Sequence, residues 1–280
     1  MFTWQRRRNG FQEKLEAGDR PTAIWLNIPW APLAEIFGSC GVDAALIDME
    51  HTSNDFGDIE SLIIACDAAG VTPIVRPPSL DTHVVNRLLD AGAQGIIFAD
   101  IRTRAEAEFA ASCTKYPPLG RRGWGGSHTR YAMWEGLPAT AAMKEVTAEG
   151  RGVYSEEYVQ KANSSILTYL IVESPEGVGN IDDIASVPGI DAVSFGWADY
   201  SVQSGFNLGV VEEAANKVYQ SCKRHGIGTS LSVGQAGNSE YFPGCYFICG
   251  IDTLIISGAI RQTLVDARMK ISVSRNLEIP

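Results

Sequence analysis

Strand-like and helix-like segments alternate along almost the whole of this chain. Eight short apolar runs predict buried strands, and they begin at Thr22, Ala44, Pro73, Gly95, Ile166, Ala192, Gly228 and Thr253. Helical segments lie between them, and several end in the glycine that closes a helix in the left-handed conformation. Such an alternation predicts an α/β fold of the closed (β/α)8, or TIM, barrel type, with an open doubly wound sheet as the alternative.

The segment over residues 116–165 departs from this rhythm. It contains Pro117, Pro118, Pro138 and the run GRRGWGG, and it is too long and irregular for a simple connection between helix and strand. A chain of 280 residues is close to the roughly 250 residues of a typical barrel. We therefore expect a single barrel domain over residues 1–280, with an insertion that forms either a lid or a subunit interface.

The composition argues against several classes of function. A formal net charge of -10 disfavours nucleic-acid binding, which depends on dense Lys and Arg. No apolar stretch approaches the roughly 20 residues that span a bilayer. The six cysteines lack the dense spacing of a disulfide scaffold and are expected to be reduced thiols in the core. We therefore expect a cytoplasmic protein with neither nucleic-acid nor membrane partners.

Titratable residues gather where the expected strands end. In strand order, from the second to the sixth, they are Asp48, Glu50 and His51, then Arg76, Asp100, Glu173 and Asp199. The carboxyl ends of the strands of a parallel barrel meet at one rim, so these side chains should face a shared pocket. The convergence of reactive groups from distant parts of the sequence predicts an active site.

Glu173 and Asp199 are candidate metal ligands. Each follows a long apolar run, so both carboxylates should lie in a poorly solvated mouth. Two such charges about 4 Å apart repel by roughly 4 kcal/mol at an effective dielectric constant of about 20. A hard cation such as Mg²⁺ or Mn²⁺ removes this repulsion and keeps positions open for water and a bidentate 2-oxo acid. The alternative is that each carboxylate caps a helix or pairs with a lysine.

His51 and Arg76 are candidate catalytic groups. Asp48 precedes His51 by three residues, and an aspartate that accepts an imidazole N–H makes the histidine a better base. The planar fork of Arg76 suits a substrate carboxylate. The alternatives are a solvated loop histidine and an arginine paired with an internal Asp or Glu.

Several motifs in combination resemble a known family. They are LIDMEH, VRPP, LLDAGAQG, YPPLGRRG, IVESPEGVGNIDDIASVPGIDAVSFGWADYSVQSG and GIDTLIIS. From about Trp25 to the last helix, the chain is similar to the HpcH/HpaI aldolases, metal-dependent class II pyruvate aldolases. The resemblance implies a barrel of the phosphoenolpyruvate/pyruvate type and a divalent ion, Mg²⁺ or Mn²⁺ with Co²⁺ as a further candidate. It also implies a homo-hexamer, a trimer of dimers with exchanged last helices.

The resemblance also implies roles for individual residues. By this resemblance, the Asp48 and His51 pair is the general base, and Arg76 contacts the keto acid. Asp90 corresponds to a carboxylate that reaches a neighbouring subunit's site. Metal binding falls on Glu173 and Asp199. The segment that holds the substrate carboxylate through its backbone amides corresponds to Gly196, Trp197 and Ala198.

The chain departs from the family pattern near the expected acceptor pocket. Trp197 stands where the family has proline, Phe98-Ala99-Asp100 replaces another proline-containing turn, and the 116–165 connection is longer. With further aromatic residues in the insertion, these departures predict a larger or more aromatic acceptor than short aldehydes. The alternative is that they pack at a subunit interface. The insertion residues concerned are Trp124, His128, Tyr131 and Trp134.

The expected function is a metal-dependent lyase that breaks a carbon–carbon bond in a small-molecule 2-oxo acid. The reaction is reversible aldol cleavage of a 4-hydroxy-2-oxo acid to pyruvate and an aldehyde, decarboxylation of oxaloacetate, or both. A close alternative resembles macrophomate synthase, which adds an oxaloacetate-derived enolate to a pyrone or aromatic acceptor. In a third reading, the barrel is a scaffold or binding module without activity.

Overall fold

The structure is a computed structural model that describes residues 9–125, 143–146, 152–154, 156–232 and 241–277. Its main sheet has eight strands, every neighbouring pair of which is parallel. In chain order they are β1 (Thr22–Leu26), β2 (Ala44–Asp48), β3 (Thr72–Arg76), β4 (Gly95–Phe98), β7 (Leu167–Val172), β8 (Ala192–Phe195), β9 (Ser230–Ser232) and β10 (Tyr246–Ile251).

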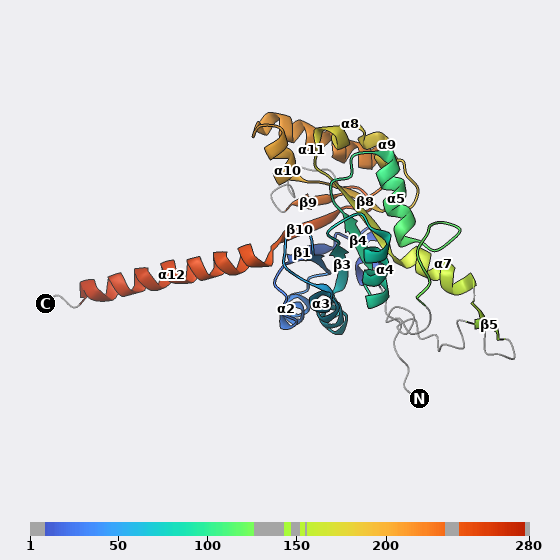
Figure 1. Ribbon diagram of the computed structural model, residues 1–280. Helices are drawn as coiled ribbons and strands as arrows, with labels where there is room; N and C mark the ends of the chain where they lie inside the picture. Colours follow the sequence, from blue (N-terminus) through green and yellow to red (C-terminus); the bar gives the residue numbers. More distant parts are fainter. Residues whose placement is uncertain (1–8, 126–142, 147–151, 155, 233–240, 278–280) are drawn as a thin grey trace.

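The sheet curls into a nearly closed barrel (Figure 1). Its strand order is β8-β7-β4-β3-β2-β1-β10-β9, and a parallel bridge between Ala192 and Gly228 joins the two ends. At this seam Val193 N–H donates to the Gly228 carbonyl over 3.0 Å. A Cβ atom at residue 228 would lie 2.2 Å from the Gly244 carbonyl oxygen, so the seam requires glycine there. The predicted TIM-barrel fold is confirmed.

The strands are buried on both faces, as expected of a parallel sheet. One hydrophobic cluster fills the barrel, and it includes Leu46, Ile74 and the stacked rings of Tyr169 and Tyr246, whose centroids are 5.3 Å apart. A larger cluster joins the outer strand faces to the helices. Helix α1 (Gly10–Glu16) closes the amino end of the barrel by placing Phe11 inside the first cluster.

Most helices begin and end where capping residues predict. Helix α3, for example, starts with a capping box at Asp55 and ends at Gly70, which has a φ of 73°. The described helices after β1 are α2 (Pro32–Ser39), α3 (Phe56–Ala69), α4 (Thr82–Ala91), α5 (Arg104–Thr114), α7 (Glu156–Ser165), α8 (Pro175–Gly179), α9 (Ile181–Ala185), α10 (Trp197–Gln203), α11 (Leu208–His225) and α12 (Asp252–Leu277). None of the described helices is both long enough and apolar enough to cross a membrane.

The strand predicted at Thr253 is wrong. The eighth strand is β10, which lies just before it, and the apolar run TLIIS forms the first turns of α12. The Asp252 carboxylate fixes the start of α12 next to β1, because its Oδ2 accepts hydrogen bonds from the N–H groups of Asn27 and Ile28, just after β1. Helix α12 then extends away from the barrel (Figure 1), so apolar residues such as Leu254 are exposed instead of buried in a sheet.

The 116–165 segment is described in part. It contains a cis peptide bond between Pro117 and Pro118 and an antiparallel pair, β5 (Met143–Val146) and β6 (Gly152–Tyr154). Trp124 packs against Tyr116, whereas His128, Tyr131 and Trp134 lie outside the described residues. Whether the insertion forms a lid or an interface stays a prediction. All six cysteines are free, but Cys40 and Cys249 are exposed, so the expectation of a core position was wrong for these two.

Candidate active site

A pocket of about 360 Å³ lies at the carboxyl ends of the strands. Its lining includes most of the candidate residues, which lie at or just after the ends of β2, β3, β7 and β8. They are Asp48, His51, Arg76, Glu173, Gly196, Trp197, Ala198 and Asp199. The structure therefore brings together eight of the nine predicted site residues, all except Asp90.

Glu173 follows β7 and is buried. Burial raises the pKa of its carboxyl to about 7, and the negative charges of Asp199, Glu50 and Asp100 add to this effect. The Glu173 carboxylate also lies close to the backbone of Gly196, just after the end of β8. A Cβ atom at residue 196 would lie only 2.4 Å from Glu173 Oε2, which explains the glycine at that position.

Asp199 lies in the first turn of the short helix α10, where Gly196 is the N-cap. The N–H of Gly196 donates to the Val172 carbonyl over 3.0 Å and is already used. The amides of Trp197 and Ala198 belong to the first helical turn, where N–H groups have no intrahelical acceptor. Of the three residues predicted to hold a substrate carboxylate, these two have the better placed donors.

Arg76 and Asp48 form a bidentate pair in the floor of the pocket. Nε and Nη2 of Arg76 each donate to one oxygen of Asp48 over 2.8 Å, and Nη1 lies 3.1 Å from Glu50 Oε2. Burial would raise the pKa of Asp48, but the hydrogen bonds and charge of Arg76 hold it below its usual value. The guanidinium lies over the Trp25 ring and keeps further N–H groups that can donate to a substrate.

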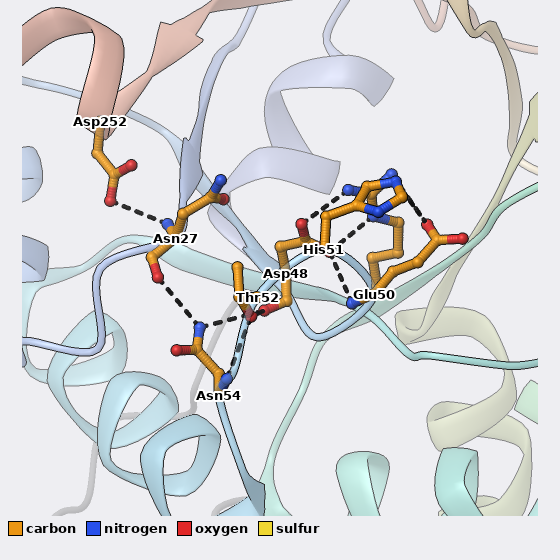
Figure 2. A network of polar contacts seen from close by, with 8 residues as sticks. Asn27, Asp48, Glu50, His51, Thr52, Asn54 and Asp252 are labelled. Atoms are coloured by element: carbon orange, nitrogen blue, oxygen red, sulfur yellow. Dashed lines mark hydrogen bonds and ion pairs between the residues drawn. The ribbon is translucent and has the colours of Figure 1, made fainter. Parts of the chain in front are cut away.

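His51 does not make the expected hydrogen bond with Asp48. Its side chain is 61% exposed, and its Nε2 lies 3.7 Å from Glu50 Oε2. Asp48 instead accepts hydrogen bonds from Arg76. It also accepts one from the backbone N–H of Glu50, as Figure 2 shows. His51 is therefore close to the aspartate, but Arg76 occupies the carboxylate that was expected to orient the imidazole.

Asp90 and Asp100 lie outside this pocket. Asp90 is on α4, where its carboxylate pairs with Arg122 over 3.2 Å. Asp100 and Phe98, together with Glu50, line a second cavity of about 240 Å³. The proposed role of Asp90 at a neighbouring subunit's site stays a prediction.

The first strand also contributes to the pocket, which the sequence pattern of charged residues did not indicate. Trp25 and Asn27 line the pocket, and so do Ser194 and Ser230. The signal was available in the alternation of strand residues: Ala23 faces the barrel interior, so Trp25 and Asn27 continue the same side toward the rim. By the same alternation, Leu46 and Asp48 lie on one side of their strand, and so do Ile171 and Glu173.

The residues present fit a divalent cation. Glu173 and Asp199 supply two hard oxygen donors. The pKa of Glu173 is raised by burial first and by neighbouring negative charge second, and a cation would offset both effects. No group of three or more His, Cys, Asp or Glu side chains suited to a metal occurs in the described part of the chain. A cation held by this pair would therefore keep open positions for substrate.

Comparison with known proteins assigns the chain to a family. Residues 22–245 match HpcH/HpaI aldolase/citrate lyase. The chain belongs to this family. It is 32% identical to the hydroxypyruvate/pyruvate aldolase of Deinococcus radiodurans, covering 90% of this chain and 87% of that protein. It is 29% identical to the 2-keto-3-deoxy-L-rhamnonate aldolase of Escherichia coli, covering 91% and 92%.

Macrophomate synthase shares the fold of this family member, with a TM-score of 0.76 at 21% identity over 95% of this chain and 90% of that one. The predicted resemblance is thus confirmed. Because the curated relatives are aldolases and aldolases are lyases, this chain is an enzyme of the lyase class. The scaffold reading is set aside.

Proposed function

We propose that this HpcH/HpaI family enzyme cleaves 4-hydroxy-2-oxo acids to pyruvate and an aldehyde, in a reversible reaction that requires a divalent metal. The observation that carries the proposal is the grouping of Glu173, Asp199, Arg76 and His51 around one pocket at the carboxyl rim. The family generally depends on a divalent metal. Bound by Glu173 and Asp199, an ion such as Mg²⁺, Mn²⁺ or Co²⁺ would polarise the 2-oxo group as a Lewis acid.

The protein's own groups would carry the remaining chemistry. The amides of Trp197 and Ala198 hold the substrate carboxylate, and Arg76 donates to the 2-oxo oxygen as negative charge develops there. His51 removes the proton of the 4-hydroxyl group. The C3–C4 bond then breaks, leaving its electron pair on C3, and the aldehyde departs. Protonation of C3 completes pyruvate.

Decarboxylation of oxaloacetate fits the same arrangement, because loss of carbon dioxide also leaves an electron pair on C3. An acceptor reaction of the macrophomate synthase kind remains the second candidate. It is favoured by Trp197, which is 38% exposed and borders the pocket beside Asp199. An aromatic acceptor could stack on its indole ring.

The proposal includes assembly into a homo-oligomer, a hexamer arranged as a trimer of dimers. It is supported by α12, which carries exposed apolar residues along its length. Asp90 would then complete a site across a subunit boundary.

A substrate panel tests the reaction. Pyruvate release is measured from several 4-hydroxy-2-oxo acids and from oxaloacetate, with added Mn²⁺ and after exhaustive chelation. We expect metal-dependent release of pyruvate from at least one member of each group. Full turnover after chelation, or no turnover of any substrate with metal, would refute the proposal.

A further inference from the structure

Asn27 lies on the side of the pocket opposite the candidate metal ligands. In the strand order β7-β4-β3-β2-β1, four steps separate Glu173 at the end of β7 from Asn27 just after β1, which is half of the eight-stranded ring. A substrate whose 2-oxo acid end lies at Glu173 and Asp199 would therefore direct its other end, the aldehyde portion, toward Asn27.

The backbone of Asn27 is held on both sides (Figure 2). Its N–H donates to Asp252 Oδ2 over 2.9 Å, and its carbonyl accepts from Asn54 Nδ2 over 3.2 Å. The same Nδ2 group donates to the Asp48 carbonyl over 3.1 Å. Buried Asp252 and Asn54 thus fix the position of Asn27 relative to Asp48 at the end of the neighbouring strand.

The side chain of Asn27, in contrast, takes no part in this network. Its Oδ1 is buried and accepts no hydrogen bond from any described residue. Ser194, another neutral polar residue of the lining, is instead paired with the Tyr246 hydroxyl. A pocket-lining carboxamide whose oxygen has no hydrogen-bond donor among the described residues is a group prepared to bind a ligand, since an unmade hydrogen bond in a buried setting costs free energy.

We propose that Asn27 is a specificity residue that hydrogen-bonds a hydroxyl group on the aldehyde portion of the substrate. A hydroxyl suits the site because it donates and accepts, and so matches either end of the carboxamide. A carboxylate suits it less, because Asp48, Glu173 and Asp199 already supply negative charge to the pocket. The inference rests on the proposed aldol cleavage and narrows it to hydroxylated aldehydes.

The test compares two substrates that differ by one hydroxyl. Cleavage of 4-hydroxy-2-oxopentanoate gives acetaldehyde, whereas cleavage of 4,5-dihydroxy-2-oxopentanoate gives glycolaldehyde. Values of kcat/KM are measured with Mn²⁺ for the wild type, for Asn27→Ala and for Asn216→Ala, an exposed control on α11. Asn27→Ala should fold, because the hydrogen bonds at this position use only the backbone.

We expect Asn27→Ala to lower kcat/KM for the dihydroxy substrate by roughly 3- to 10-fold, the effect of one neutral hydrogen bond. The value for the monohydroxy substrate should change by less than about 2-fold, and Asn216→Ala should change neither. Equal losses on both substrates, or no loss on either, would overturn the inference. If the wild type cleaves neither these two substrates nor any other 4-hydroxy-2-oxo acid of the panel, the aldol proposal itself has failed, which is a distinguishable result.

Discussion

Two buried carboxyl groups of the same pocket have pKa values that are shifted in opposite directions. Asp48 is held ionised by Arg76, whereas the pKa of Glu173 is raised to about 7 by burial and by the nearby Asp199. Divergent pKa values of neighbouring groups commonly mark different chemical roles. Asp48 then acts as a fixed negative charge that orients Arg76, whereas Glu173 is the residue that we propose as a ligand of the cation.

The raised pKa of Glu173 predicts a pH-dependent stability. The folded protein binds this proton more tightly than the unfolded chain, where the pKa is near 4.5, so the contribution to the free energy of unfolding is lost as pH rises through about 7. We expect the unfolding temperature of the chelated wild type, relative to Glu173→Gln, to fall between about pH 5 and about pH 8.

Adding Mn²⁺ should reverse this fall for the wild type alone, because the ion binds the ionised form of the carboxylate pair. Unfolding temperatures are measured by differential scanning fluorimetry across the pH series. Parallel curves for the wild type and Glu173→Gln, with and without the ion, would contradict the assignment of Glu173 as a metal ligand.

His51 should affect proton transfer but not metal binding. We expect His51→Ala to reduce kcat by ~10²- to 10⁴-fold, the usual contribution of a general base, with an unchanged affinity for Mn²⁺ measured by calorimetry. His83→Ala on α4 serves as a control, since His83 is also exposed but lies outside the pocket. Unchanged cleavage in His51→Ala would assign the base elsewhere.

At the scale of secondary-structure elements, Asp252 connects α12 to β1. It is buried, and its loss would leave the N–H groups of Asn27 and Ile28 without their acceptor. We expect Asp252→Ala to lower the free energy of unfolding by at least about 1–3 kcal/mol in urea denaturation. Asp266→Ala, on an exposed turn of the same helix, should cost less than about 0.5 kcal/mol. Equal effects would mean that the Asp252 contacts contribute little.

Periodicity in the sequence was sufficient to predict seven of the eight strands of the main sheet. It also predicted most helices, because capping residues mark their ends. It failed at TLIIS, since an apolar run on an exposed helix and one in a buried strand look alike when neither partner nor burial is known. Residues at strand ends were found because charge after an apolar run is conspicuous. Asn27 was missed because a neutral residue gives no such signal, and the Arg76–Asp48 pair depends on side-chain geometry that spacing does not determine.

At the scale of the whole molecule, α12 is the element that the barrel leaves uncovered. Its 26 residues span about 39 Å, and it carries many exposed apolar side chains. They are Leu254, Ile255, Ile256, Ile260, Leu264, Val265, Met269 and Ile271. Burying such a surface against another copy of the chain would be favourable, which supports the proposed oligomer.

We therefore expect light scattering to give a mass that is a multiple of 30.3 kDa, with six copies as the proposed number. The double variant Ile260→Asp, Leu264→Asp should dissociate the assembly, because it would place charge in a buried interface. Gln262→Asp, which adds one charge at a polar position of the same helix, should leave the mass unchanged. A fully active wild-type monomer would contradict the oligomer.

The seam between β8 and β9 is the place where we expect the barrel to open locally. Elsewhere around the ring neighbouring strands share at least two register positions, but in the described residues these two ends meet at the single Ala192–Gly228 bridge. Brief local opening should begin where the fewest hydrogen bonds must break. Because β8 leads directly into Gly196 and Asp199, such fluctuations would change the spacing of the two carboxylates while the rest of the barrel stays intact. Exchange of the proposed cation, or of product, would use this motion.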